Sequence, residues 1–155
     1  MALQAGAARV DITPRLGGHL DGNVADRVST NIHDQLYAQA IVLDNGETRL
    51  GIVVCDLIVV LRDMADEVKR LVADQAGIAP ENLLVTGTHT HYAPAVFGAF
   101  LTEPEPEYAA SVPARIADAV ALAARRLQPA QLGWAFTACP TEVHNRRWHL
   151  TDGTV

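Results

Sequence analysis

Cysteine is scarce in this sequence, and its scarcity narrows the classes of protein to consider. The 155 residues contain two cysteines, Cys55 and Cys139, and neither belongs to a Cys-x-x-Cys pair. A disulfide-stapled scaffold and a cysteine zinc site are therefore not expected. Free cysteine is among the most buried residue types, so we expect both thiols to be buried within strands. This usage is compatible with a reducing compartment.

Positive charge is also in short supply. The chain has 12 Lys and Arg residues against 18 Asp and Glu residues, which gives a formal net charge of −6. Proteins that bind nucleic acid neutralise its phosphates with Lys and Arg. Nucleic acid is therefore not an expected partner.

Long hydrophobic runs are missing as well. The longest, 50–61, has 12 residues and contains Asp56, whereas a membrane-spanning helix needs about 20 apolar residues. The segment 1–14 has no basic stretch followed by an apolar core, so no signal peptide is predicted, and a cytoplasmic location is favoured. With 49% hydrophobic and 19% charged residues, the chain is not a disordered one. Its length suits a single domain over residues 1–155.

The hydrophobic pattern predicts strands that alternate with helices. Strands are expected at 5–12, 36–43, 49–54, 82–88 and 132–137, and helices at 62–76 and 107–127. Asn45-Gly46 lies between the second and third strands and predicts a hairpin with a type I′ turn. Gly77 is a plausible helix end, and the segment 16–30 reads as a long loop. The order indicates an α/β fold with a mixed sheet, an N-terminal β-hairpin and flanking helices.

One internal proline leaves two readings of the second helix. Pro113 falls inside the expected helix 107–127. It either kinks the helix or marks its first turn, in which case Ser111 is the cap.

The sharpest candidate site is Thr88-His89-Thr90-His91-Tyr92-Ala93-Pro94. It directly follows the predicted strand 82–88, and ligands in α/β sheets favour the carboxyl ends of strands. Two histidines at positions i and i+2 lie on the same side of an extended segment. Neutral imidazole is a common zinc ligand. The pair therefore suits one metal ligand and one acid, base or oxyanion partner, or else two histidines bonded to loop carbonyls.

Other polar residues are weaker candidates. His33-Asp34 could pair a ligand with an orienting carboxylate, although adjacent side chains diverge on a strand. Asp56 interrupts an apolar run, where a carboxylate is costly unless it is paired, ligated or at a turn. The segment 144–149 holds two histidines and Arg146, whose guanidinium suits a carboxylate or an oxyanion, or is simply a solvated basic turn. Asp11 and His19 are weaker still.

Two common site types are absent from the sequence. There is no Gly-x-Ser-x-Gly nucleophile elbow. The segment 16–19, Leu-Gly-Gly-His, lacks the spacing of a phosphate-binding loop.

Several segments together resemble the neutral/alkaline, non-lysosomal ceramidase family. They are, in order, residues 5–14, Ile32-His33-Asp34 with 36–40, Cys55-Asp56-Leu57, Thr88–Pro94 and Asn145-Arg146-Arg147. The resemblance extends over nearly the whole chain, and the Thr-His-Thr-His segment with a later Asn-Arg is its most specific part. Residues 92–93, Tyr-Ala, stand where the family often has Ser-Gly.

The resemblance implies a zinc-dependent hydrolase of the ceramide amide bond, of which this chain is the N-terminal part of the catalytic domain. It places His89 as a zinc ligand, His91 near the scissile amide as a transition-state stabiliser, and Arg146 in the active site. The implied partners are zinc, a small-molecule amide or lipid substrate, and the remainder of the domain or another chain. The family's other zinc ligands and its nucleophile have no counterpart here.

The candidate residues and the resemblance leave three alternative functions. The first is a ceramidase-like amidohydrolase. The second is a non-catalytic module that binds a partner chain, because one histidine cannot hold catalytic zinc, which usually takes three protein ligands. The third is a metal hydrolase acting on another bond, such as a phosphoester.

Overall fold

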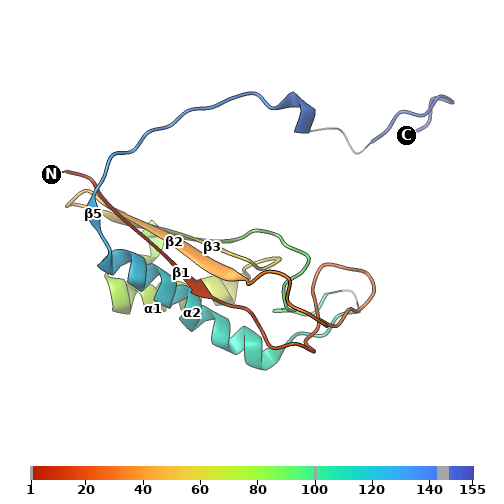
Figure 1. The fold of residues 1–155 in the computed structure, drawn as a ribbon, viewed down its shortest axis with the longest axis horizontal. Coiled ribbons are helices and arrows are strands. Elements are labelled where there is room, and N and C mark those ends of the chain that lie inside the picture. The colour runs from red at the N-terminus through yellow and green to blue at the C-terminus, as the bar shows by residue number, and fades with distance from the viewer. Residues whose placement is uncertain (1, 100, 143–146) are drawn as a thin grey trace.

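The protein folds as one mixed sheet with two helices on one of its faces (Figure 1). The computed structural model describes residues 2–99, 101–142 and 147–155. Its strands are β1 Gln4–Asp11, β2 Tyr37–Asp44, β3 Arg49–Cys55, β4 Leu83–Gly87 and β5 Gln128–Pro129. Its helices are α1 Arg62–Ala76 and α2 Pro106–Arg125, with short 3₁₀ turns at Pro80–Asn82 and Pro140–Glu142. The predicted α/β class, with a hairpin and flanking helices, is confirmed.

The sheet runs in the order β4-β3-β2-β1-β5. The pairs β1–β2, β2–β3 and β1–β5 are antiparallel, while β3 and β4 are parallel. Parallel neighbours need a crossover connection, and α1 supplies it. This connection brings the ends of β3 and β4 to the same edge of the sheet, where the candidate histidines follow.

The strands of the hairpin alternate in burial because the helices cover only one face of the sheet. In β2, Ala38, Ala40 and Val42 are buried while Gln39 and Ile41 are exposed. Side chains two residues apart share a face of a strand. The core lies between this buried face and the apolar sides of the helices, which contribute Val68, Val72, Val112, Ile116 and Val120.

The opposite face of the sheet carries apolar side chains that no described residue covers. Ile41, Ile52 and Leu84 lie on it with 51%, 36% and 54% of their surface exposed. Ile52 pairs with Ile41 in β2 and with Leu84 in β4, so the three form one row across three strands. Burying such a row would stabilise the protein, because apolar surface is favourably removed from water.

Helix α1 has the predicted bounds, and Gly77 ends it. Gly77 adopts φ 63°, and its N–H donates to the carbonyl of Ala73. A left-handed residue at this position satisfies a carbonyl that the helix leaves without a partner. Glycine adopts this conformation at little cost.

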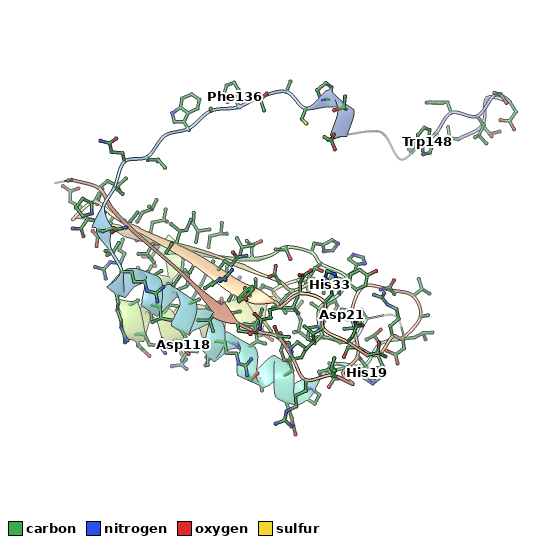
Figure 2. All side chains as sticks on the ribbon, in the orientation of Figure 1. His19, Asp21, His33, Asp118, Phe136 and Trp148 are labelled. Atoms are coloured by element: carbon green, nitrogen blue, oxygen red, sulfur yellow. The ribbon has the colours of Figure 1, made fainter. Side chains whose placement is uncertain are left out.

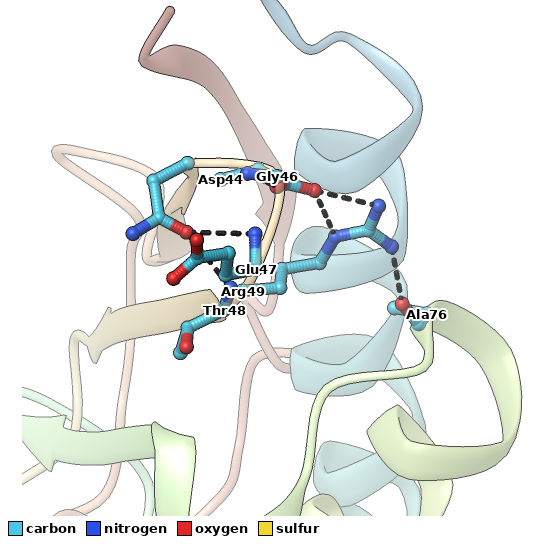
Figure 3. Close-up of polar contacts among 7 residues, drawn as sticks. Asp44, Gly46, Glu47, Thr48, Arg49 and Ala76 are labelled. Carbon is cyan, nitrogen blue, oxygen red and sulfur yellow. Dashed lines mark hydrogen bonds and ion pairs between the residues drawn. The ribbon is translucent and has the colours of Figure 1, made fainter. Parts of the chain in front are cut away.

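The hairpin is confirmed, but its turn is not the predicted type I′ (Figure 3). Asp44 pairs with Arg49, so the connection has four residues, and Gly46 has a positive φ while Asn45 does not. A type I′ turn requires positive φ at both central residues. Side chains hold the observed turn: the Asp44 carboxylate accepts from the Gly46 N–H at 2.7 Å, and the side-chain Oδ1 of Asn45 accepts from the N–H groups of Glu47 and Thr48.

Arg49 ties this hairpin to the end of α1 (Figure 3). Its guanidinium donates to the Asp44 carboxylate at 2.9 Å and to the Ala76 carbonyl at 2.8 Å. The Gly46 amide and, after it, the Arg49 guanidinium lower the pKa of Asp44. The contact fixes the helix C-terminus against the sheet.

Helix α2 settles the question that Pro113 raised. The helix begins at Pro106, so Pro113 lies inside it and Ser111 is not its cap. Ser111 instead donates its hydroxyl to the Tyr108 carbonyl at 2.8 Å, within the helix. Proline suits the first helical position because its N–H would have no partner there, and Pro106 takes that position.

Two expectations for the C-terminal segment are wrong. Residues 132–137 form no strand, and Leu132, Trp134 and Phe136 are 75%, 83% and 89% exposed. β5 pairs only with Gln4 and Ala5, at the start of β1, and the chain then runs past the edge of the sheet. A strand needs a neighbour to pair with, and the described residues offer none there.

Cys139 lies in this same exposed segment, so its expected burial in a strand is wrong. Cys55 is buried in β3, as expected. None of the helices in the described ranges has the length and hydropathy needed to cross a bilayer.

Candidate functional site

The Thr-His-Thr-His segment begins where β4 ends, as the sequence predicts. After the paired strands stop, the two chains stay together: the Thr88 N–H donates to the Cys55 carbonyl at 2.9 Å, and the His89 N–H donates to the Leu57 carbonyl at 3.1 Å. Both bonds extend the parallel pairing of β3 and β4 beyond the strands. His89 therefore stands at the carboxyl edge of the sheet, and its side chain is exposed.

The backbone and the ring of His89 are both held in defined positions. Its φ is 63°, and it is the one non-glycine residue in the described ranges with a positive φ. Such a conformation costs on the order of 1–3 kcal/mol, and residues that adopt it cluster at active sites and ligand clamps. The ring Nδ1 lies 2.9 Å from the Ile58 carbonyl oxygen. A carbonyl only accepts, so in the neutral ring Nδ1 carries the proton and Nε2 keeps the lone pair.

His91 lies against His89, but for a different reason from the one expected. The left-handed His89 breaks the extended path on which the i, i+2 argument depends. The two rings nevertheless meet edge to face, with centroids 5.1 Å apart and planes at 82°. The structure thus brings the two candidate histidines together through the turn.

A second loop packs along this segment. The predicted long loop forms a short bridge between Leu20 and Pro94. The Asp21 N–H donates to the Ala93 carbonyl at 3.1 Å, and the Ala95 N–H donates to the His19 carbonyl at 2.9 Å. The two loops are therefore joined by backbone bonds on both sides of the bridge.

Asp21 is a fully buried carboxyl group in this junction (Figure 2). Its Oδ2 accepts from the Val96 N–H at 3.2 Å, while Oδ1 has no partner among the described residues. Burial raises the pKa of Asp21, and the amides of Val96 and Phe97 oppose that rise. A buried carboxylate is costly unless its oxygens are bonded, so this group is an unexpected feature of a glycine-rich loop.

Arg27 reaches from the same loop to His91. Its guanidinium donates to the His91 carbonyl at 2.7 Å and lies over the Tyr92 ring, 4.9 Å from its centroid. Gly22, with φ 97°, passes so close to His91 that a Cβ placed there would lie 2.6 Å from its ring carbon Cγ. The sequence analysis did not single out Asp21, Gly22 or Arg27. The acidic residue beside a glycine in a long loop was a signal for the first two, and Arg27 had none.

His33 also lies at this end of the molecule (Figure 2), and Asp34 follows it in the chain. They lie in a bend rather than a strand, so their side chains do not diverge as expected, and Nδ1 is 2.7 Å from the carboxylate. This hydrogen bond raises the pKa of His33. Both residues line a hollow of about 590 Å³ together with Arg27, Thr90 and Tyr92.

The remaining candidates have local structural roles. Asp56 accepts from the Tyr37 N–H at 2.9 Å and closes the open end of the hairpin. Asp11 accepts from the Thr13 N–H at 2.7 Å and forms a turn, and the Thr13 side chain and, after it, this N–H lower the pKa of Asp11. His19 lies 2.7 Å from Asp26, and this bond raises the pKa of His19.

The candidate segment 144–149 lies only partly within the described residues. His144, Asn145 and Arg146 lie outside the described residues, and His149 is exposed in the C-terminal segment. In the part of the chain that the structure describes, no group of three His, Cys, Asp or Glu side chains is placed to hold a metal ion.

Part of the sequence is similar to a neutral ceramidase. No family model matches the chain. The neutral ceramidase of Mycobacterium tuberculosis (strain ATCC 25618 / H37Rv) is 31% identical over 107 residues, which is 64% of this chain and 17% of that protein.

Solved structures agree on the fold. The crystal structure of neutral ceramidase from Pseudomonas aeruginosa matches 83% of this chain with a TM-score of 0.73 and 24% identity. A ceramidase complexed with C2 matches the same share with a TM-score of 0.72 and 24% identity. The chain spans 22% of each of these chains and 17% of the curated relative. It is homologous to neutral ceramidase over part of that protein's length.

Proposed function

We propose that this chain is part of a ceramidase-like, zinc-dependent hydrolase of linear amide bonds, with His89 as a zinc ligand. The observation that carries the proposal is the bond between His89 Nδ1 and the Ile58 carbonyl. Histidines that bind metal usually donate their second ring N–H to a carbonyl or carboxylate, which orients the other nitrogen. The ring of His89, an exposed residue, has this arrangement, which leaves Nε2 as the nitrogen for the metal.

The donor set fits zinc only in part. Imidazole nitrogen is a preferred zinc ligand, but a catalytic zinc usually takes three protein ligands and a water. The described residues supply no group of three placed donors. The proposal therefore assigns the remaining ligands to a larger catalytic domain or to another chain. The uncovered apolar row of Ile41, Ile52 and Leu84 supports a larger domain, because it offers a surface for a further layer.

The roles of this chain's residues follow from their positions. Zinc, when bound, polarises the amide carbonyl and lowers the pKa of its bound water. His89 would hold the metal through Nε2. His91, whose ring lies against that of His89, would donate a hydrogen bond to the oxyanion that develops on the carbonyl. Arg146 is proposed for the same task on its sequence motif alone.

The neighbouring hollow suits an amide with an apolar portion. It is lined by the apolar side chains of Leu16, Leu20, Val28 and Ile32 as well as by polar ones. Small-molecule sites are mostly apolar with a few placed polar groups. A small-molecule amide or a lipid is the proposed substrate.

The test is a zinc titration of the chain, followed by NMR of the histidine rings. Zinc is expected to shift the His89 resonances first. His89→Ala should remove that response, and His149→Ala, which changes an exposed histidine of the C-terminal segment, should keep it. Hydrolysis of an N-acyl substrate is then measured with the remaining domain or chain present. Unshifted His89 resonances, together with unchanged hydrolysis by His89→Ala, would contradict the proposal.

The second candidate is a module that binds a partner chain and does no chemistry. It is favoured by the incomplete donor set and by the open apolar face. A chain that associates with its partner, yet shows neither zinc binding nor hydrolysis in the assembled state, would establish this alternative.

A further inference from the structure

We infer that the loop 19–27 is a positioning clamp for His91, in which Gly22 makes room for the ring and Arg27 holds the backbone behind it. The inference rests on the proposed function in one respect: a fixed position of His91 benefits catalysis only if His91 acts on the substrate. The contacts of Gly22 and Arg27 with His91 are present without zinc and without substrate.

The first part of the clamp is the close approach of Gly22. A Cβ at this position would lie 2.6 Å from His91 Cγ and 2.7 Å from both His91 Nδ1 and the Cδ1 of Ile58. Cγ is attached directly to the His91 Cβ, so the ring cannot clear a new methyl group without a change of rotamer. Any side chain at residue 22 would therefore displace the ring. Glycine also accepts the φ of 97° that brings the backbone so near.

The second part is Arg27. Its guanidinium donates to the His91 carbonyl at 2.7 Å and stacks over the ring of Tyr92, the next residue. A charge-assisted hydrogen bond is roughly twice as strong as a neutral one. A guanidinium over an aromatic ring is attracted to the negative face of that ring. Two contacts from one side chain fix the peptide that carries His91.

The third part anchors the clamp itself. Asp21 is buried beside Gly22 and accepts from the Val96 N–H, and the backbone bonds around Leu20 and Pro94 hold the two loops in register. The junction lies two to five residues beyond His91, so it holds the chain on the far side of the ring. His91 is thus bounded by His89 on one side, Gly22 on another and Arg27 behind its carbonyl.

The chain offers a matched control for the Gly22 contact. Gly17 lies in the same long loop 16–30 but outside the clamp, with φ 90°, and a Cβ placed on it meets nothing within 4 Å. Gly17→Ala and Gly22→Ala therefore share the cost of a left-handed alanine. Only Gly22→Ala adds an obstruction at His91.

The experiment is NMR of the histidine rings in the full chain, without zinc or substrate, alongside thermal unfolding. In the wild type, cross-peaks between the His89 and His91 rings are expected. Gly22→Ala and Arg27→Met should lose these cross-peaks, while Gly17→Ala should keep them despite its lower unfolding temperature. Arg27→Lys, which keeps a donor for the carbonyl, should restore them in part.

The clamp is overturned if Arg27→Met retains the wild-type cross-peaks, or if Gly22→Ala and Gly17→Ala give the same histidine spectra. Should Gly22→Ala fail to fold, the Arg27 variants decide alone. Loss of the cross-peaks in a protein whose His89 ignores zinc would support the clamp and reject the proposed function. Intact cross-peaks in an active Arg27→Met enzyme would reject the clamp and support the proposed function.

Discussion

The approach of β4 to the backbone beyond β3 gives a prediction that links the fold to the site. Gly87 is the last residue of β4 and precedes His89 by two positions. A Cβ on Gly87 would lie 2.9 Å from the Leu57 carbonyl oxygen, about 0.5 Å closer than an ordinary van der Waals contact. The obstruction is backbone, which cannot rotate away. Gly87→Ala should therefore push the end of β4 away from residue 57.

The expected cost has two sources. Overpacking of this kind costs about 1–3 kcal/mol. The displacement also weakens the bond from the His89 N–H to the Leu57 carbonyl, and a typical hydrogen bond contributes about 1 kcal/mol. The sum is about 2–4 kcal/mol of unfolding free energy, which for a chain of this size lowers the unfolding temperature by roughly 5–15 °C.

The assay is urea unfolding for the free energy, with NMR of the His89 ring for the local effect. Gly51→Ala is the control, because its new Cβ would meet the Leu83 side chain at 2.7 Å, and that side chain can rotate. It should cost less than Gly87→Ala and leave the His89 resonances in place. The reasoning is refuted if Gly51→Ala is the more destabilising variant, or if Gly87→Ala leaves the His89 ring proton at Nδ1 bonded as before.

Three further outcomes are expected. Tyr108→Phe should lower the unfolding free energy, measured with urea, by about 1–3 kcal/mol. The Tyr108 hydroxyl donates to the carbonyl of the buried Ile12 at 2.6 Å, and the substitution removes this donor. A thiol reagent should modify one cysteine of the native chain quickly: Cys139 is exposed, whereas burial raises the pKa of Cys55 to about 12, so Cys139→Ser should abolish the fast reaction. NMR titration should give His19 a pKa above 6.5, which Asp26→Asn should lower. Because the folded pKa is the higher one, this pair stabilises the fold below pH 6.5, and its contribution disappears as the pH rises through the folded value.

Much of the architecture could be predicted because local patterns and packing agree. Helix α1 has the bounds that its apolar spacing and Gly77 predict, and the hairpin follows from two β-branched runs around Asn45-Gly46. The segment 132–137 shows the limit of such patterns. Its apolar alternation is that of a strand, yet a strand forms only where an edge is available to pair with it, and sequence periodicity does not report edges.

The candidate site was predictable in its position but not in its geometry. The Thr-His-Thr-His segment could be placed at the carboxyl end of a strand from the order of residues alone. The left-handed backbone of His89 and the edge-to-face rings that follow from it could not be predicted. Neither could the bonds of His89 to Ile58 and of His91 to Arg27, because these join segments far apart in the chain. The His91 carbonyl and Arg27, for example, are 64 residues apart in sequence.

The sequence by itself determined the class of fold, the hairpin, the ends of α1 and the resemblance that singles out His89 and His91. Those features depend on neighbouring residues, whose spacing and backbone preferences are present in any conformation of the chain. Only the tertiary structure decided which nitrogen of His89 bonds to a carbonyl and which loop holds His91. These depend on a carbonyl and a guanidinium that folding alone brings within hydrogen-bonding distance.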